Sequence, residues 1–299
     1  MNWYGTELKT WKAALHMHST TSDGQYAPQE LIDLYASKGF DILAFSDHWK
    51  TNRVEDLDPR GMSLISGIEL HPAGPRGREW HILALHVPFD FNVEKARTHV
   101  QKGIDMVNDC GGIAVCAHPY WCGFSAQDVA QLDHVGILEV YNTSCRGIGK
   151  EYNMQVWDDL LDMGLHYNAI AVDDTHFPEH LFFGWSMIAS PSSDPASVVA
   201  ALRMGRFYAT QGPEIKALTI ENGIFHAEFT PVVNAILVGK ANQGLYGALE
   251  AEKGPDTPFR EVSSVDLDLK RLKCRCGDYV RLQLKDARGR MAWSNPVWL

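Results

Sequence analysis

The segment KAALHMHSTTSDG, residues 12–24, contains two histidines one residue apart, followed by a Ser-Asp-Gly turn. On a β-strand, residues i and i+2 face the same side, so His16 and His18 would project together, as two ligands of one metal ion must. A His-x-His pair also occurs on strands where it is structural or simply exposed. The pair alone therefore leaves both interpretations open.

Further polar groups follow apolar, strand-like segments along the chain. They are Asp47 and His48 after DILAFS, Glu69 after SLISGI, His118 after IAVCA, and Asp174 and His176 after NAIAV. In a parallel barrel the carboxyl ends of the strands meet at one mouth, so residues distant in sequence would share one pocket. Independent surface histidines would have to reach these strand ends by chance.

His81 differs, because it begins the segment HILAL. The preceding link, LHPAGPRGREW, is rich in Gly and Pro and too short for a helical crossover, so the sequence predicts an antiparallel return strand. The start of that strand would then lie at the same mouth. Imidazole and carboxylate together suit zinc, iron or manganese better than calcium or magnesium.

The first two thirds of the chain alternate strand-like and helical segments, which is typical of α/β architecture. In residues 26–48, Pro28 suits a first helical position, Leu31 and Tyr35 recur at helical spacing, and Gly39 can end the helix in a left-handed conformation. A strand over 41–46 follows directly. The helix therefore lies between two strands of the expected barrel.

After about Gly212 the sequence changes to alternating strands and turns, which predicts a small, mostly antiparallel β domain. In RLKCRCGDYVRLQLK, period-two alternation places Cys274 and Cys276 on one apolar face, and Gly277 with Asp278 forms a turn signal. We expect both cysteines to face the domain interior. A Cys-x-Cys metal site is the weaker interpretation.

The composition limits the class of protein. The chain has 299 residues, 45% of them hydrophobic, and a formal net charge of −10, which disfavours a broad contact with a nucleic-acid polymer or an anionic membrane. Its six cysteines are too sparse for a disulfide scaffold. With no signal-peptide pattern or membrane-spanning run in the sequence, we expect a cytoplasmic protein. The sequence leaves the oligomeric state open.

The motifs HMHSTTSDG, SDH, GIE, HILAL, AHP and DDTH occur in the order found in the PHP (polymerase and histidinol phosphatase) superfamily of metal-dependent hydrolases, which the chain resembles over residues 10–210. The resemblance implies a distorted seven-stranded (β/α) TIM-like barrel in residues 1–211. Residues 212–299 would form a β-sandwich-like accessory domain, and the segments WDDLLDMG, GRFYATQGPEI and AWSNPVWL are similar to carbaryl-hydrolase-like members.

Carried over to this sequence, the resemblance implies two or three divalent zinc, manganese or iron ions. The implied ligands of the first ion are His16, His18, Glu69 and Asp174; those of the second are Glu69, His81 and His118; those of the third are Asp23, His48 and His176. Such ions lower the pKa of a bridging water and clamp phosphoryl oxygens.

The leading functional hypothesis is a phosphoesterase that hydrolyses a small phosphorylated substrate with metal-activated water. Asp174, His176 and His48 are the expected catalytic residues, and Arg146 and Asn142 the expected substrate-binding residues. Two alternatives stay open: a metal-dependent hydrolase of a carbamate, ester or amide, and a non-catalytic metal-bound module. Asp173 would orient its neighbours and His71 would lie at the rim, while six further histidines would be structural or exposed: His86, His99, His134, His166, His180 and His226.

Overall fold

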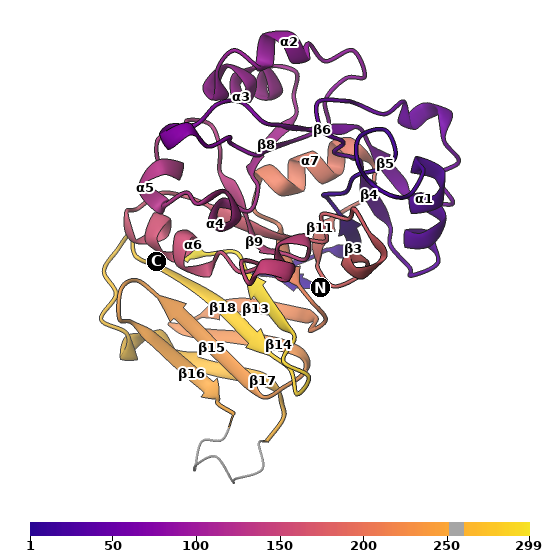
Figure 1. Cartoon of the computed structure of the whole chain (residues 1–299). Helices are drawn as coiled ribbons and strands as arrows, with labels where there is room; N and C mark the ends of the chain where they lie inside the picture. Colours follow the sequence, from indigo (N-terminus) through magenta and orange to yellow (C-terminus); the bar gives the residue numbers. More distant parts are fainter. Residues whose placement is uncertain (251–259) are drawn as a thin grey trace.

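The computed structural model describes residues 1–250 and 260–299. Strands alternate with helices through the first two thirds of this mixed α/β chain, and the last third consists mostly of strands (Figure 1). The helices are α1 (Pro28–Ala36), α2 (Val93–Ala96), α3 (Val100–Asp109), α4 (Pro119–Cys122), α5 (Ala126–Val129), α6 (Met154–Asp162) and α7 (Pro195–Arg203). Within the described ranges, every helix is too short or too polar to cross a membrane.

One five-stranded sheet has the order β10-β9-β8-β7-β6. Its strands are β6 (Gly67–Leu70), β7 (Ile82–Leu85), β8 (Ile113–Cys116), β9 (Ile137–Asn142) and β10 (Asn168–Val172). β8, β9 and β10 are parallel, whereas β7 is antiparallel to both β6 and β8. The predicted antiparallel return after His81 is therefore confirmed, and His81 lies at the same edge of the sheet as the residues that end β8 and β10.

A second sheet of ten strands runs from the upper, mixed part of the molecule into the lower β part. Its strands are β3 (Lys9–Ala14), β4 (Ile42–Ala44), β5 (Ser63–Ile65), β11 (Trp185–Ser190), β12 (Phe207–Thr210), β15 (Asn234–Gly239), β16 (Gly244–Ala248), β18 (Tyr279–Lys285), β19 (Met291–Ser294) and β20 (Val297–Trp298). β3, β4 and β5 are parallel. Isolated parallel bridges, Met17 to Thr175 and His48 to Glu69, join the ends of the two sheets.

Apolar side chains from both sheets pack into one buried cluster. It includes Ala13, Ile42 and Ile65 from the second sheet and Leu83, Val115 and Ile170 from the first. Burial of such side chains contributes about 1.5–3 kcal/mol each. The two sheets therefore share a filled apolar interior.

Helix α1 matches its sequence pattern. It begins at Pro28, and Gly39 three residues beyond its end has φ +70°, the left-handed conformation expected there. Its buried residues include Leu31 and Tyr35. The Tyr35 hydroxyl donates to Asp173 Oδ2 over 2.7 Å, so the helix also fixes the segment that follows β10.

A third sheet lies in the lower part, with the order β17-β14-β13-β1-β2. Its strands are β1 (Asn2–Trp3), β2 (Thr6–Glu7), β13 (Ile215–Glu221), β14 (Ile224–Val232) and β17 (Val262–Asp268). The amino-terminal β1 pairs in parallel with β13, and β12 pairs with β19. Strand pairings thus cross the expected boundary between residues 211 and 212, and the division into two domains stays a prediction.

The prediction that both neighbouring cysteines face the domain interior is wrong for Cys276. β18 begins only at Tyr279, and Cys276 is exposed while Cys274 is half-buried beside the lower core. The preceding residues form a turn, in which Arg275 N donates to Asp278 Oδ2 and Gly277 has φ +90°. This turn breaks the period-two alternation that would have placed both thiols on one face. All six cysteines are free.

Candidate metal centre

The nine predicted metal ligands come together at one end of the strands. They are His16 and His18 after β3, Asp23 in the next loop, His48 after β4, Glu69 in β6, His81 before β7, His118 after β8, and Asp174 and His176 after β10. Backbone bonds fix their order in space: His18 N donates to the Thr175 carbonyl and Asp174 N to that of His16. The strand-end rule therefore predicted which side chains lie close together.

The Glu69 carboxylate lies at the centre of the cluster and is 1% exposed. Six imidazole nitrogens surround it: for Oε2, His48 Nδ1 at 2.9 Å, His71 Nε2 at 3.1 Å, His18 Nε2 at 3.4 Å and His16 Nε2 at 3.7 Å; for Oε1, His81 Nδ1 at 2.9 Å and His118 Nε2 at 3.3 Å. One carboxylate thus faces all three implied ligand sets.

Asp174 is the second buried carboxylate. Its Oδ1 lies 3.1 Å from His18 Nε2 and 3.2 Å from His16 Nε2, and its Oδ2 lies 3.9 Å from His118 Nε2. Both Asp174 and His118 have positive φ, +52° and +24°. Such backbone conformations cost of order 1–3 kcal/mol each and cluster at functional sites, where the surrounding structure enforces them.

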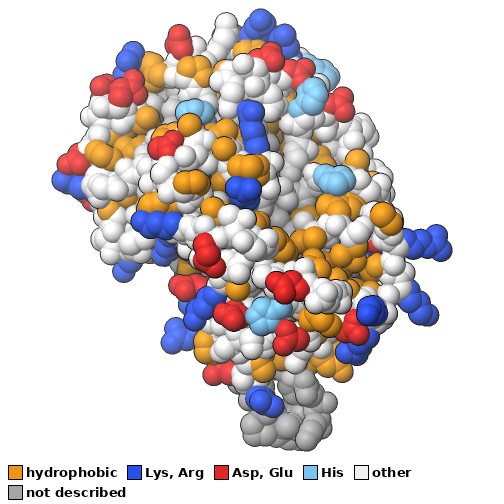
Figure 2. Space-filling view, turned by 180° about the vertical axis from the view of Figure 1, so that it is seen from behind, with side chains coloured by type: hydrophobic (Ala, Val, Ile, Leu, Met, Phe, Trp, Pro, Cys, Tyr) orange, Lys and Arg blue, Asp and Glu red, His pale blue; other side chains and the backbone are white. Residues whose placement is uncertain are grey.

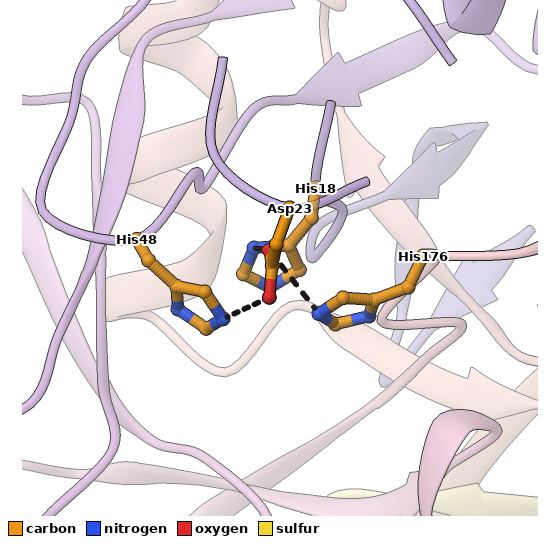
Figure 3. Close-up of side chains that lie close together, drawn as sticks. All are labelled: His18, Asp23, His48 and His176. Atoms are coloured by element: carbon orange, nitrogen blue, oxygen red, sulfur yellow. Dashed lines mark ion pairs between the residues drawn. The ribbon is translucent and has the colours of Figure 1, made fainter. Parts of the chain in front are cut away.

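Asp23 forms the outer part of the cluster (Figure 3). Its Oδ1 lies 3.6 Å from His176 Nε2 and 3.7 Å from His18 Nδ1, and its Oδ2 lies 3.4 Å from His48 Nε2. The four side chains converge from three separate segments of the chain. Because Asp23 is about half exposed, this group is the one most open to solvent.

Hydrogen bonds to Asp47 hold the loop that carries Asp23. Asp47 Oδ1 accepts from the backbone N–H groups of Ser19 and Ser22, and Oδ2 accepts from the Ser19 hydroxyl. A Cβ at Gly24 would lie 2.1 Å from the His18 carbonyl oxygen, so only glycine fits this close turn. The Ser-Asp-Gly turn therefore positions Asp23 over the histidines.

Charge and burial compete strongly in this cluster. Burial alone would raise the pKa of Glu69, but His81 and His16 hold it well below its usual value, and His16 does the same for Asp174. Burial lowers the pKa of His18 to about 4, whereas for His16 the neighbouring carboxylates, Asp174 above all, outweigh burial and raise the pKa. The two carboxylates thus stay ionised, as metal binding requires.

The cluster leaves ligand atoms without hydrogen-bond partners. Four of the buried polar side-chain atoms that lack a partner in the described residues lie in or beside it: His18 Nδ1, His48 Nδ1 and Asp174 Oδ1 of the predicted ligands, and Nε2 of the neighbouring His71. Buried polar groups are otherwise nearly always paired. His18, His48 and His71 also belong to groups whose ligand atoms lie within 4.8 Å of one another, and the nitrogen and oxygen donors of these groups fit a divalent transition-metal ion.

Sequence reasoning missed Glu139. Its Oε1 accepts from His16 Nδ1 over 2.6 Å, and its Oε2 accepts from His118 N and Asn142 Nδ2. A carboxylate behind a ligand histidine fixes the ring orientation and raises its basicity. The available signal was a charged residue inside the fully buried strand β9.

The structure separates the two residues expected to bind substrate from the open cavity. Asn142 is buried, and its Nδ2 donates to Asp174 Oδ2 over 3.1 Å, so it holds a candidate ligand. Arg146 is exposed, stacks on Phe183 with 3.9 Å between the guanidinium carbon and the ring centroid, and donates to the Glu179 carbonyl. Arg146 does not line the cavity at the cluster.

That cavity has a volume of about 270 Å³. Its lining comprises Asp23, His48, Glu69, His81, His118, Trp121, Ser144, Cys145, Asp174, His176, Phe177 and His180. Sequence analysis had placed His180 among structural or exposed histidines and had not named Trp121 or Phe177. Asp173 lies behind the site, where it accepts from Tyr35 and from backbone N–H groups of residues 182–184.

No family model matches the chain. It is 35% identical over 81 residues to a 5'-3' exoribonuclease of Haemophilus influenzae, and 37% identical over 78 residues to a phosphoribosyl 1,2-cyclic phosphate 1,2-diphosphodiesterase of Eggerthella lenta. These alignments cover 26% and 24% of this chain, and 29% and 30% of the two relatives. The chain thus spans less than a third of the length of these curated relatives.

The likeness to a solved structure extends over the whole chain. A two-domain protein of Bacteroides vulgatus that contains a predicted PHP-like metal-dependent phosphoesterase superposes with a TM-score of 0.57 at 17% identity. The alignment covers 97% of this chain and 96% of that protein. At this identity the likeness concerns the fold. The chain therefore shares the overall fold of that protein.

Proposed function

We propose that this protein is a metal-dependent phosphoesterase that hydrolyses a small phosphorylated substrate. The observation that carries the proposal is the convergence of nine predicted ligands, two of them the buried carboxylates Glu69 and Asp174, with three buried ligand atoms left without hydrogen-bond partners in the described residues. The PHP-like fold of the B. vulgatus protein and the partial matches to two phosphodiester-cleaving enzymes support the same class of reaction.

The three ligand sets stay as the motifs predict them, with Glu69 shared between the first two sets. They would hold two or three zinc, manganese or iron ions, and the two sheets would act as a distorted (β/α) barrel with the lower β part as its accessory domain. Divalent cations bound there would lower the pKa of water and neutralise charge on phosphoryl oxygens. The six free thiols fit the expected cytoplasmic location.

The chain's own residues supply positioning and proton transfer. His176 Nδ1 lies 2.9 Å from the Asp174 carbonyl, which leaves Nε2 facing Asp23 at the cavity wall. His48 presents its Nε2 to the same carboxylate. Where these nitrogens do not hold a third ion, they are placed to give a proton to the leaving oxygen. Asp174 and Asn142 hold this arrangement together through a 3.1 Å hydrogen bond.

Pockets for small molecules have volumes from roughly 300 Å³ upward. The cavity at the cluster, about 270 Å³, lies near the lower end of this range and therefore favours a small substrate. Trp121 and Phe177 line the cavity and are 43% and 46% exposed, so they would contact the part of the substrate that projects from the metal cluster. Arg146 would bind substrate phosphate only after leaving its stacking partner Phe183.

Metal-reconstituted protein should be assayed against phosphomonoesters, phosphodiesters and aryl carbamates in ¹⁸O-labelled water. We expect hydrolysis of a phosphate ester, loss of activity with a chelator, recovery with Mn²⁺ or Zn²⁺, and label in the released phosphate. Label found only in the alcohol would reject attack at phosphorus. Hydrolysis of carbamates alone would favour the alternative hydrolase, and no turnover by metal-loaded protein would favour a non-catalytic module.

A further inference from the structure

His71 belongs to a ligand group outside the three sets that the motifs imply. It follows β6 and is two residues from Glu69, a spacing that places both side chains on the same side, as with His16 and His18. His48, Glu69 and His71 offer three ligand atoms within 4.8 Å of one another. Sequence analysis had placed His71 only at the rim.

Two nitrogen atoms point to one carboxylate oxygen in this group. His48 Nδ1 lies 2.9 Å and His71 Nε2 lies 3.1 Å from Glu69 Oε2. Both nitrogens are buried, yet neither has a hydrogen-bond partner in the described residues. A histidine that served only to donate to Glu69 would be aligned for that bond. These rings are close to the carboxylate but are not oriented for a hydrogen bond.

These distances suit coordination of a common ion. Zinc binds imidazole nitrogen and carboxylate oxygen at about 2.0–2.2 Å, so two ligand atoms on one ion are about 3.0–3.5 Å apart, the longer value for tetrahedral geometry. The two histidine distances to Glu69 Oε2, 2.9 and 3.1 Å, lie close to this range. Two imidazoles and one carboxylate also form a donor set preferred by divalent zinc, manganese or cobalt.

The neighbours of His71 hold its ring between the second and third implied sets. The ring stacks on His81 at 3.9 Å between centroids and meets His48 edge-on at 4.3 Å. Trp49 lies edge-on at 6.0 Å on another side. Such packing limits rotation of the His71 ring, so Nε2 stays directed at the Glu69 carboxylate.

We propose that His71 is a metal ligand, and that His48, Glu69 and His71 form a further divalent-cation position between the second and third implied sets. This inference rests on the metal dependence proposed above. His48 Nδ1 faces this position and its Nε2 faces the set that contains Asp23. A neutral imidazole binds one ion, so filling both positions at once would require His48 to release its ring proton to solvent.

Equilibrium dialysis of the full chain against Zn²⁺, followed by elemental analysis, tests this position, with Co²⁺ absorption as a second readout. Loss of a residue that only supports a ligand lowers metal affinity about 10- to 100-fold. We expect His71→Ala to lower the affinity for one metal equivalent by more than this and to change the Co²⁺ spectrum. His81→Ala should also lower metal content, whereas the exposed His134→Ala should match the wild type. The chelated variants should melt like the chelated wild type.

His71→Asn separates a ligand from a hydrogen-bond donor, because its amide can donate but coordinates poorly. We expect it to behave like His71→Ala. Wild-type affinity and spectrum in either variant would overturn the inference, even if the protein hydrolysed phosphate esters. The wild-type protein could instead bind a metal equivalent that is lost in the His71 variants and yet hydrolyse none of the substrates. That result would support the inference and contradict the proposed function.

Discussion

The two ends of strands β8, β9 and β10 differ in chemistry. The candidate metal centre lies beyond their carboxyl ends, and a larger cavity of about 560 Å³ lies at their amino ends, lined by Ile113, Ile137 and Asn168 together with Trp298 from the lower part. Figure 2 shows hydrophobic side chains gathered where the upper part meets the lower sheets. The larger cavity is twice the volume of the one at the metal centre.

Polar groups at the larger cavity are mostly used by the fold. Asn295 accepts from Ala169 N and donates to two carbonyls, and Arg203 donates to the carbonyls of Gly111 and Gly112. Tyr4 contributes one buried hydroxyl without a partner in the described residues, against four such atoms at the metal centre. The candidate metal centre therefore has more unpaired buried polar atoms than the larger cavity, although its cavity is the smaller of the two.

The largest effect should come from Glu69→Gln. The change removes the carboxylate that faces six imidazoles, so we expect at least two metal equivalents to be lost and hydrolysis to fall by more than about 100-fold. Elemental analysis and initial rates on the same preparation measure both. An unchanged metal content in the folded variant would contradict the assignment of a metal centre around Glu69 at the carboxyl ends of the strands.

The strand-end argument explains why so much of the site could be predicted. Apolar segments stop abruptly at residues such as His48, His118 and Asp174, and parallel strands bring those stops together without any knowledge of side-chain contacts. Glu139 was missed because it lies inside a buried strand, where a polar residue looks like an exception to the pattern. Its role depends on a partner 123 positions away, His16.

Long-range pairing limited the rest of the prediction. The parallel register of β1 with β13 joins residues more than 200 positions apart, and no local pattern specifies it. Arg146 follows a strand end like the ligands, but its stacking on Phe183 turns it away from the cavity. The turn at Gly277 likewise changed the faces of Cys274 and Cys276.

Glu139→Gln should have the next largest effect. It leaves every predicted ligand in place and therefore tests the hydrogen bonds behind the ligands separately. The neutral amide cannot match the carboxylate that accepts from His16 Nδ1, so we expect metal affinity to fall about 10- to 100-fold. Zn²⁺ dialysis measures the change, with Glu151→Gln as the control on the adjoining segment. Excess metal should restore activity, which a collapsed site would not allow.

A polar pair outside the metal centre should affect stability and not metal content. The Arg76 hydrogen bonds hold the pKa of Asp128 well below its usual value against the opposing effect of burial. Because the folded-state pKa is depressed, this stabilisation is present above about pH 4 and is lost as pH falls through the folded-state value. Arg76 is half exposed, so solvent screens the pair and its own contribution to stability is small.

Asp128→Asn in chelated protein tests this pair. We expect the free energy of unfolding to fall by about 1–2 kcal/mol at pH 7, since the change also weakens the Ser125 capping box at the start of α5. The difference between variant and wild type should shrink at pH 3 and below. Urea titrations at both pH values measure it, and a difference that grew on acidification would contradict the assignment.

Trp298→Ala should have the smallest effect on hydrolysis. It tests most directly whether the two ends of the strands act independently. Trp298 lines the larger cavity, where its ring stacks on His166 at 4.1 Å and contacts Tyr279. Truncation should lower stability by about 1–3 kcal/mol through lost packing. Because its contacts lie at the opposite strand ends, we expect unchanged metal equivalents and hydrolysis within about twofold of wild type in fully folded protein. A tenfold or greater loss of turnover with full metal content would show that the two ends act together. The larger cavity at the amino ends would then contribute to hydrolysis as well.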